Sequence, residues 1–205
     1  MRRTLLPIAA ALALMTGLGS PAAAQDAEVD PQIFDKSIAE RAAHSQGLEA
    51  ANAQINVPDH PQKSLNTAAI SADQGLMAVF AAEKPGGLDD RLTVSAEIRK
   101  HADAMLDAAD AAERDVATLA DRARDDSSMQ SEAAQARVEA ALTSYRESLA
   151  GEREISQHLT DIAARVEQPG EVDWEAIETQ IAAIETLFQN RDALAQARKA
   201  ASDRR

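Results

Sequence analysis

Large apolar residues in the second half of the chain recur at alternating steps of four and three positions. This heptad spacing is the pattern of helices that pack along one seam. The first run predicts a helix over residues 88–124, and a second run, whose rhythm slips by one residue near Glu152, predicts a helix that ends before Pro169. The predicted helix-packing seam consists of Ile98, Met105, Val116, Leu119, Val138, Leu142, Leu149, Ile155 and Ile162.

The two seam helices are expected to have similar lengths and to be separated by the polar stretch at residues 125–128. This stretch is rich in the residue types that begin helices, and a short connection between equal helices favours an antiparallel hairpin. A turn centred there places Ile98 opposite Ile155 and Met105 opposite Leu149, so large apolar residues meet. The pattern therefore predicts a hairpin, and one continuous helix is the alternative.

The chain before the hairpin predicts further helical structure. Asp30 followed by Pro31 is typical of a helix start, and the helix that begins there should end before Pro58. The following residues 56–66 are expected to form a loop.

Two further helices are expected on either side of the seam helices. The segment Ser71-Ala72-Asp73-Gln74 has the form of a capping box and predicts a short helix that ends at the breaker Pro85-Gly86-Gly87. A last helix is expected over residues 173–201, with Asp173 as its N-cap and with Val172 and Ile177 packed together around that cap.

Alanine accounts for 46 of the 205 residues, and no convincing alternation of Val, Ile or Thr marks a strand. The predicted fold class is all-α: an elongated antiparallel helical hairpin or bundle with coiled-coil-like, alanine-rich packing. The organisation expected along the chain is an export signal peptide at 1–24, an N-terminal helix, loop and short helix at 25–87, and the hairpin with the C-terminal helix at 88–205.

The first 24 residues have the features of a cleaved signal peptide. Arg2 and Arg3 give a positive start, an apolar run follows, and Ala22-Ala23-Ala24 supplies small residues for cleavage. The apolar run is too short for a retained membrane anchor, since a spanning helix needs about 20 apolar residues. We therefore expect a periplasmic or secreted protein, cleaved near Ala24, that keeps no integral membrane segment.

The charge and residue usage argue against several classes of function. The chain carries 34 acidic and 21 basic residues and only five aromatic ones, which is unsuited to nucleic-acid binding. Without cysteine it can form neither a disulfide nor a thiolate metal site. No phosphate-cradling, dinucleotide-binding or hydrolase motif occurs, so we expect neither a cofactor nor a catalytic residue, and interpret the chain as a non-enzyme.

Three of the four histidines follow a glutamate by four residues, in the pairs Glu40-His44, Glu97-His101 and Glu154-His158. Each pair lies on one helix face, and such pairs are locally favourable in helices without any ligand. In the predicted hairpin, however, Glu97 comes near His158 and His101 near Glu154. These four residues are the candidate metal ligands, and ordinary helix pairing is the competing interpretation.

These features together favour a non-enzymatic interaction protein of the cell envelope, exported and acidic. The expected role is a coiled-coil-like spacer, adaptor or assembly factor whose partner is another protein or a second copy of itself, with no nucleic acid involved. One alternative is a periplasmic holdase-type chaperone for unfolded or cationic clients. Another is a metal-binding helical bundle that uses the Glu-x-x-x-His pairs.

Overall fold

The computed structural model describes residues 32–84, 87–126 and 131–202. Over these residues the chain is helical and contains no strand, so the all-α prediction is confirmed and the fold is compatible with a helical bundle. The helices are α1 (Gln32–Gln54), α2 (Pro61–Glu83), α3 (Arg91–Asp125), α4 (Glu132–Glu167) and α5 (Trp174–Ser202).

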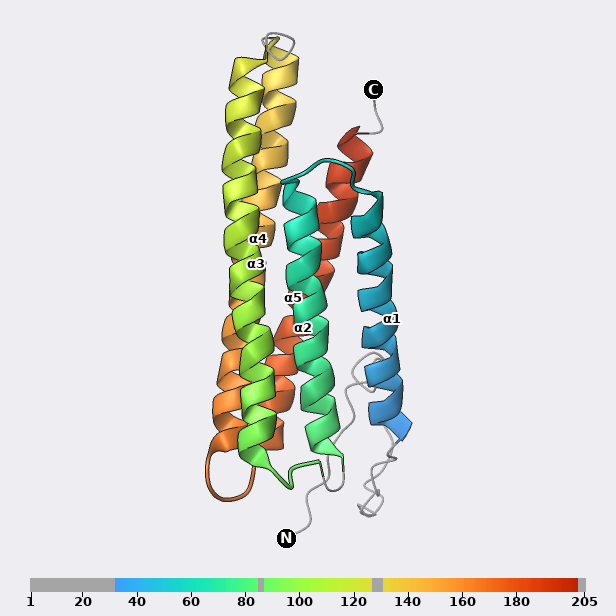
Figure 1. Cartoon of the computed structure of the whole chain (residues 1–205), viewed down its shortest axis with the longest axis vertical. Coiled ribbons are helices and arrows are strands. Elements are labelled where there is room, and N and C mark those ends of the chain that lie inside the picture. The colour runs from blue at the N-terminus through green and yellow to red at the C-terminus, as the bar shows by residue number, and fades with distance from the viewer. Residues whose placement is uncertain (1–31, 85–86, 127–130, 203–205) are drawn as a thin grey trace, which may run out of the picture.

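Successive helices run in opposite directions, and α2 lies in the middle of the bundle (Figure 1). It packs against α1, α3 and α4, while α5 packs against α4. The two longest helices, α3 and α4, lie side by side and extend beyond the ends of the other three (Figure 1). The bundle therefore has a five-helix body and a two-helix extension.

The start of α2 differs from the sequence-based prediction. His60 is the N-cap, its Nδ1 accepts a hydrogen bond from the backbone N–H of Gln62 at 3.2 Å, and Pro61 occupies the first helical turn. Residues 61–66, predicted as loop, are thus helical, and the predicted capping box at residues 71–74 lies inside the helix. Proline at the start of a helix fixes a helical φ at a position where no backbone N–H is needed. This preference outweighs the capping-box pattern ten residues later.

The other helix ends agree more closely with the sequence. Asp173 caps α5 as predicted, because its carboxylate accepts from the backbone N–H of Ala176 at 3.3 Å, and both Val172 and Ile177 are buried beside it. Asp90 caps α3 by accepting from the backbone N–H of Thr93 at 3.1 Å. The predicted start of the first helix, at Asp30 and Pro31, lies outside the described residues.

The register between α3 and α4 is not the predicted one. Ser156 Oγ donates to the carbonyl oxygen of Ala102 at 2.9 Å, so these two residues face each other. The predicted register would place Gly151 there, but a Cβ at Gly151 would meet no atom within 4 Å. The pairing is displaced because α4 begins only after its N-cap Ser131, so the connection is longer than the sequence indicated.

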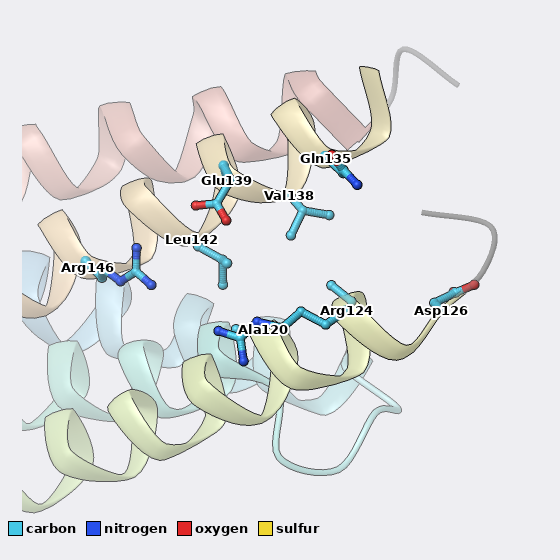
Figure 2. Close-up of a pocket in the computed structure, with 9 residues that line it drawn as sticks. Ala120, Arg124, Asp126, Gln135, Val138, Glu139, Leu142 and Arg146 are labelled. Atoms are coloured by element: carbon cyan, nitrogen blue, oxygen red, sulfur yellow. The ribbon is translucent and has the colours of Figure 1, made fainter. Parts of the chain in front are cut away.

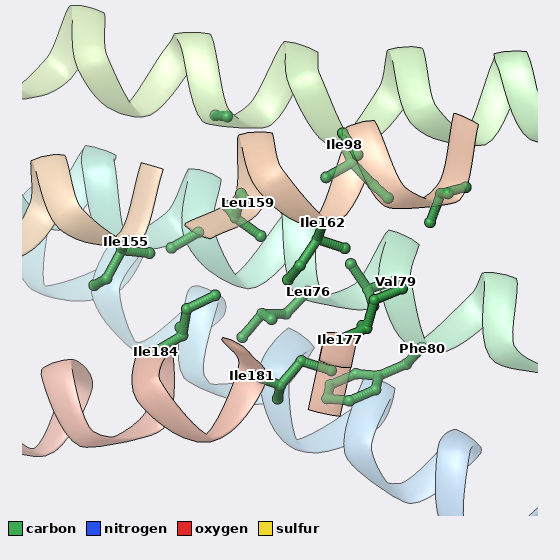
Figure 3. Packing of buried hydrophobic residues seen from close by; sticks show 14 of the residues in the cluster. Leu76, Val79, Phe80, Ile98, Ile155, Leu159, Ile162, Ile177, Ile181 and Ile184 are labelled. Carbon is green, nitrogen blue, oxygen red and sulfur yellow. The ribbon is translucent and has the colours of Figure 1, made fainter. Parts of the chain in front are cut away.

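One hydrophobic core joins side chains from α2, α3, α4 and α5, and Figure 3 shows many of them converging. Residues on both sides of the breaker at 85–87 share this core. A second cluster continues it along α3 and α4. Of the nine predicted seam residues, seven are buried, whereas Leu119 and Val138 are half-buried against the second cluster.

Gly75 allows α2 to lie close to both α3 and α4. A Cβ at this position would lie 2.8 Å from Leu159 Cδ1 on α4 and 3.4 Å from His101 Cβ on α3. Leu159 is itself fully buried, so it has little room to give way. The alanine residues that flank this contact on α2 serve the same close packing.

We expect Gly75→Ala to destabilise the protein and the matched substitution Gly47→Ala to stabilise it. Gly47 is also inside a helix, but its Cβ would meet nothing within 4 Å, so alanine there brings only its helix preference, about 0.5–1 kcal/mol. At Gly75 the same preference is outweighed by overpacking, which costs about 1–3 kcal/mol. Urea unfolding followed by circular dichroism measures the free energy of unfolding of both variants. Equal stabilisation by the two substitutions would contradict the close packing at Gly75.

Candidate functional site

A group of buried and half-buried polar residues interrupts the apolar interior where α1, α2, α4 and α5 meet. We call it the polar centre. It comprises Arg41, His44 and Ser45 on α1, Asp73 on α2, Glu152 on α4 and Arg191 on α5.

Asp73 joins α1 to α2 and has no exposed surface. Its carboxylate accepts hydrogen bonds from His44 Nδ1 at 2.6 Å, from Ser45 Oγ at 3.1 Å and from Arg41 Nη1 at 3.4 Å. A buried carboxylate needs such donors to offset its desolvation. Because a carboxylate can only accept, His44 carries its proton on Nδ1, and its Nε2 accepts from Arg191 Nη2 at 3.4 Å.

Phe188 on α5 lies between two guanidinium groups. The guanidinium carbon of Arg41 is 4.8 Å from the centre of the ring, and that of Arg191 is 4.7 Å away. Arg41 also donates to the carboxylate of Glu185 on α5. These cation–π contacts and the ion pair attach α1 to α5 through polar groups.

Glu152 differs from Asp73 because neither of its carboxyl oxygens has a hydrogen-bond partner. The side chain is 1 % exposed, and its burial raises the pKa of the carboxyl to about 7. The charge of Arg191 opposes this rise, whereas Asp73 and Asp192 add to it. Near neutral pH this group therefore exchanges a proton within the interior.

Arg191 has a complementary unmet group. Its Nε and Nη2 both donate to Asp192, but its Nη1 is buried without a partner. Both Glu152 and Arg191 line a groove of about 300 Å³ between α4 and α5, which we call the α4–α5 groove. The polar centre thus has a buried unpaired acceptor and a buried unpaired donor on two residues that line the same groove.

The candidate metal ligands are not brought together as predicted. His101 Nε2 lies 3.0 Å from Glu97 Oε1 on its own helix, and Lys100 and His101 lower the pKa of Glu97 through their hydrogen bonds. On α4, Glu154 is exposed and His158 is half-buried. Among the described residues no group of three or more His, Asp or Glu could hold a metal ion, so the four candidates do not form the expected site.

The first Glu-His pair also has different partners. His44 contacts Asp73 on the neighbouring helix. Glu40 Oε1 instead lies 3.8 Å from Lys36 Nζ on its own helix. Sequence reasoning missed Asp73 and Arg191, which resemble ordinary helix-surface residues. The slip of the seam at Glu152 was the one usable signal, because it places a carboxyl at an inward position.

A second candidate surface lies on the extension of α3 and α4. We call residues 116–125 of α3, 132–142 of α4 and the caps Asp126 and Ser131 the arm. Between its helices is the arm groove, of about 340 Å³, and Figure 2 shows Val138 and Leu142 directed from α4 toward α3. Its lining consists of Ala120, Ala123, Arg124, Asp126, Gln135, Val138, Glu139, Leu142 and Arg146.

Comparison of the chain with protein families, curated proteins and solved structures gave no match. None of the described helices combines the length and apolar character needed to cross a membrane. The functional argument therefore depends on the polar centre and the arm.

We expect Glu152→Gln to stabilise the protein increasingly as the pH rises from 5 to 7. The folded carboxyl has a pKa of about 7 against an ordinary 4.5, so unfolding releases a proton in this window and wild-type stability falls with rising pH. Glutamine cannot ionise. From below pH 4.5 to above pH 7 the stability of the variant relative to the wild type should therefore rise by about 3 kcal/mol, from 1.36 kcal/mol for each pKa unit.

Urea unfolding at several pH values, compared between variant and wild type, isolates this group from Glu83, whose pKa is also raised to about 7 by burial and by Glu178. Glu154→Gln is the matched control, because Glu154 is exposed two residues further along α4 and its charge contributes little to stability. A stability difference for Glu152→Gln that does not change with pH would show that the carboxyl does not titrate in this window.

Proposed function

We propose that this protein is an exported, non-enzymatic interaction protein of the cell envelope that associates with a second copy of itself through the arm. In this proposal the α3–α4 pair works as an elongated, coiled-coil-like hairpin that holds the docking surface away from the body. The observation that supports it most directly is the arm groove, which lies where α3 and α4 extend past the other helices (Figure 1).

The apolar residues of the arm are less completely covered than those of the body. Leu119 and Val138 stay half-buried, although they belong to the same seam as the fully buried Ile98 and Ile162. In the arm, α3 and α4 cover each other on one side only. In the body, α2 and α5 also cover the seam. A second two-helix arm would complete the packing in the manner of a four-helix bundle.

The balanced charge around the arm groove favours a second copy as the occupant. The whole chain has a formal net charge of −13, so two copies repel each other over most of their surfaces. The arm groove, in contrast, is lined by two arginines and two acidic residues, Arg124, Arg146, Asp126 and Glu139. Under a two-fold axis such a balanced set can pair with itself, as an isologous interface requires.

We expect Val138→Glu to weaken self-association by at least about tenfold, because it places an unpaired charge in the centre of the apolar contact. Ala140→Glu is the matched control, since it adds the same charge two residues away at an exposed position of α4. Sedimentation velocity over a range of protein concentrations measures the association, and circular dichroism checks that both variants stay helical.

A wild-type protein that stays monomeric at high concentration would contradict self-association. Suppression of the aggregation of unrelated unfolded proteins by such a monomer, lost in Val138→Glu, would instead favour the chaperone.

The proposed location rests on the first 24 residues, which lie outside the described part of the chain. We expect protein recovered from the periplasm of a bacterial host to begin at Gln25, because cleavage follows the small residues at 22–24. Intact-mass spectrometry measures this directly. Full-length mass in the membrane fraction would contradict the export proposal.

A further inference from the structure

We propose that the α4–α5 groove binds a small zwitterion that carries one ammonium and one carboxylate group, of the chemical class of a free α-amino acid with an apolar side chain. This site is separate from the arm and does not depend on the proposed self-association. The inference starts from two buried groups of opposite hydrogen-bonding character that line one groove.

The first group is the Glu152 carboxyl, whose two oxygens have no partner, and the second is Arg191 Nη1, which also has none. Unpaired buried polar atoms are rare in folded proteins because each one costs desolvation free energy. An ammonium group donates hydrogen bonds and would pair with Glu152. A carboxylate accepts them and would pair with Arg191. A ligand with both groups on neighbouring atoms satisfies the two residues together, whereas an amine or an acid alone satisfies only one.

The walls of the groove suit an apolar side chain. Ile155 on α4 and Leu187 and Leu194 on α5 line it, and its volume of about 300 Å³ is at the lower end of the range for small-molecule sites. Gly151 also lines the groove, and a Cβ there would meet nothing within 4 Å, so any larger residue would occupy the space. The carboxyl oxygens of Glu152 are themselves buried, so the proposal requires side chains at the groove to move when the ligand binds.

The charges around Glu152 determine when it can receive an ammonium group. Arg191 and Asp192 face it from α5 and Asp73 from α2, and His44 of α1 contacts Arg191. Asp192 already holds two nitrogens of Arg191, so the pair is close to neutral. The exposed carboxylates of Glu147 and Glu154 line the groove and attract the ammonium end. Binding therefore strengthens as Glu152 loses its proton, above about pH 7.

Isothermal titration calorimetry of the mature chain at pH 8 tests this with three probes of matched carbon skeleton. L-Leucine carries both head groups, isoamylamine only the ammonium, and 4-methylpentanoate only the carboxylate. We expect L-leucine to bind at least about tenfold more tightly than either of the other two, because each of those leaves one buried group unpaired. Binding of L-leucine should weaken at pH 6.

Two variants locate the site. Glu152→Gln should reduce L-leucine affinity by at least about tenfold while the protein stays folded, because glutamine offers the ammonium no charge. Gly151→Leu should abolish binding by filling the groove, and Gly47→Leu is its matched control, because that glycine also lies in a helix with open space at its Cβ.

Several results would overturn the proposal. One is that L-leucine does not bind the wild type at millimolar concentration, and another is that it binds Gly151→Leu as tightly as Gly47→Leu. Equal affinity for isoamylamine and L-leucine would show that Arg191 does not contact a carboxylate and that the site takes a simple cation. Self-association through the arm is tested separately, by sedimentation velocity of Val138→Glu. A failure of L-leucine to bind therefore leaves the self-association proposal standing.

Discussion

The burial of α2 among three other helices is the constraint on which the rest of the structure depends. An alanine-rich helix offers little apolar area on each face, so it gains stability only by approaching its neighbours closely. Gly75 permits that approach to α3 and α4, and Ala68, Ala69 and Ala72 are buried on the same helix with almost no exposure. The packing of α2 also brings Asp73 into the interior, where it needs donors from α1.

The polar centre follows from that geometry. Asp73 is fully hydrogen-bonded and attaches α1, whereas Glu152 lies near it without any hydrogen bond and tends to keep its proton. Burial without a donor is the main reason that the pKa of the Glu152 carboxyl is raised to about 7, and the nearby charge of Asp73 adds to this rise. Arg191 is also incompletely paired, and both residues line a surface groove.

The arm and the polar centre are different kinds of candidate site. The arm exists because α3 and α4 are longer than the helices that cover them, so part of their seam lies beyond the body (Figure 1). Its chemistry is apolar with balanced charge, which suits association with another helical surface. The α4–α5 groove is lined by both charged and aliphatic side chains, which suits a small molecule with a charged and an apolar part.

The sequence by itself determined the helical class, the cap of α5 at Asp173 and the inward positions of the seam, because alanine content, capping residues and heptad spacing act locally along the chain. It placed the start of α2 too late and set Ala102 opposite Gly151 instead of Ser156, since register depends on the length of a connection that local pattern does not define. It also paired His44 with Glu40. Only the tertiary structure decided that His44 meets Asp73 and that Glu152 meets no donor, because these contacts join helices distant in sequence and follow from how the whole bundle packs.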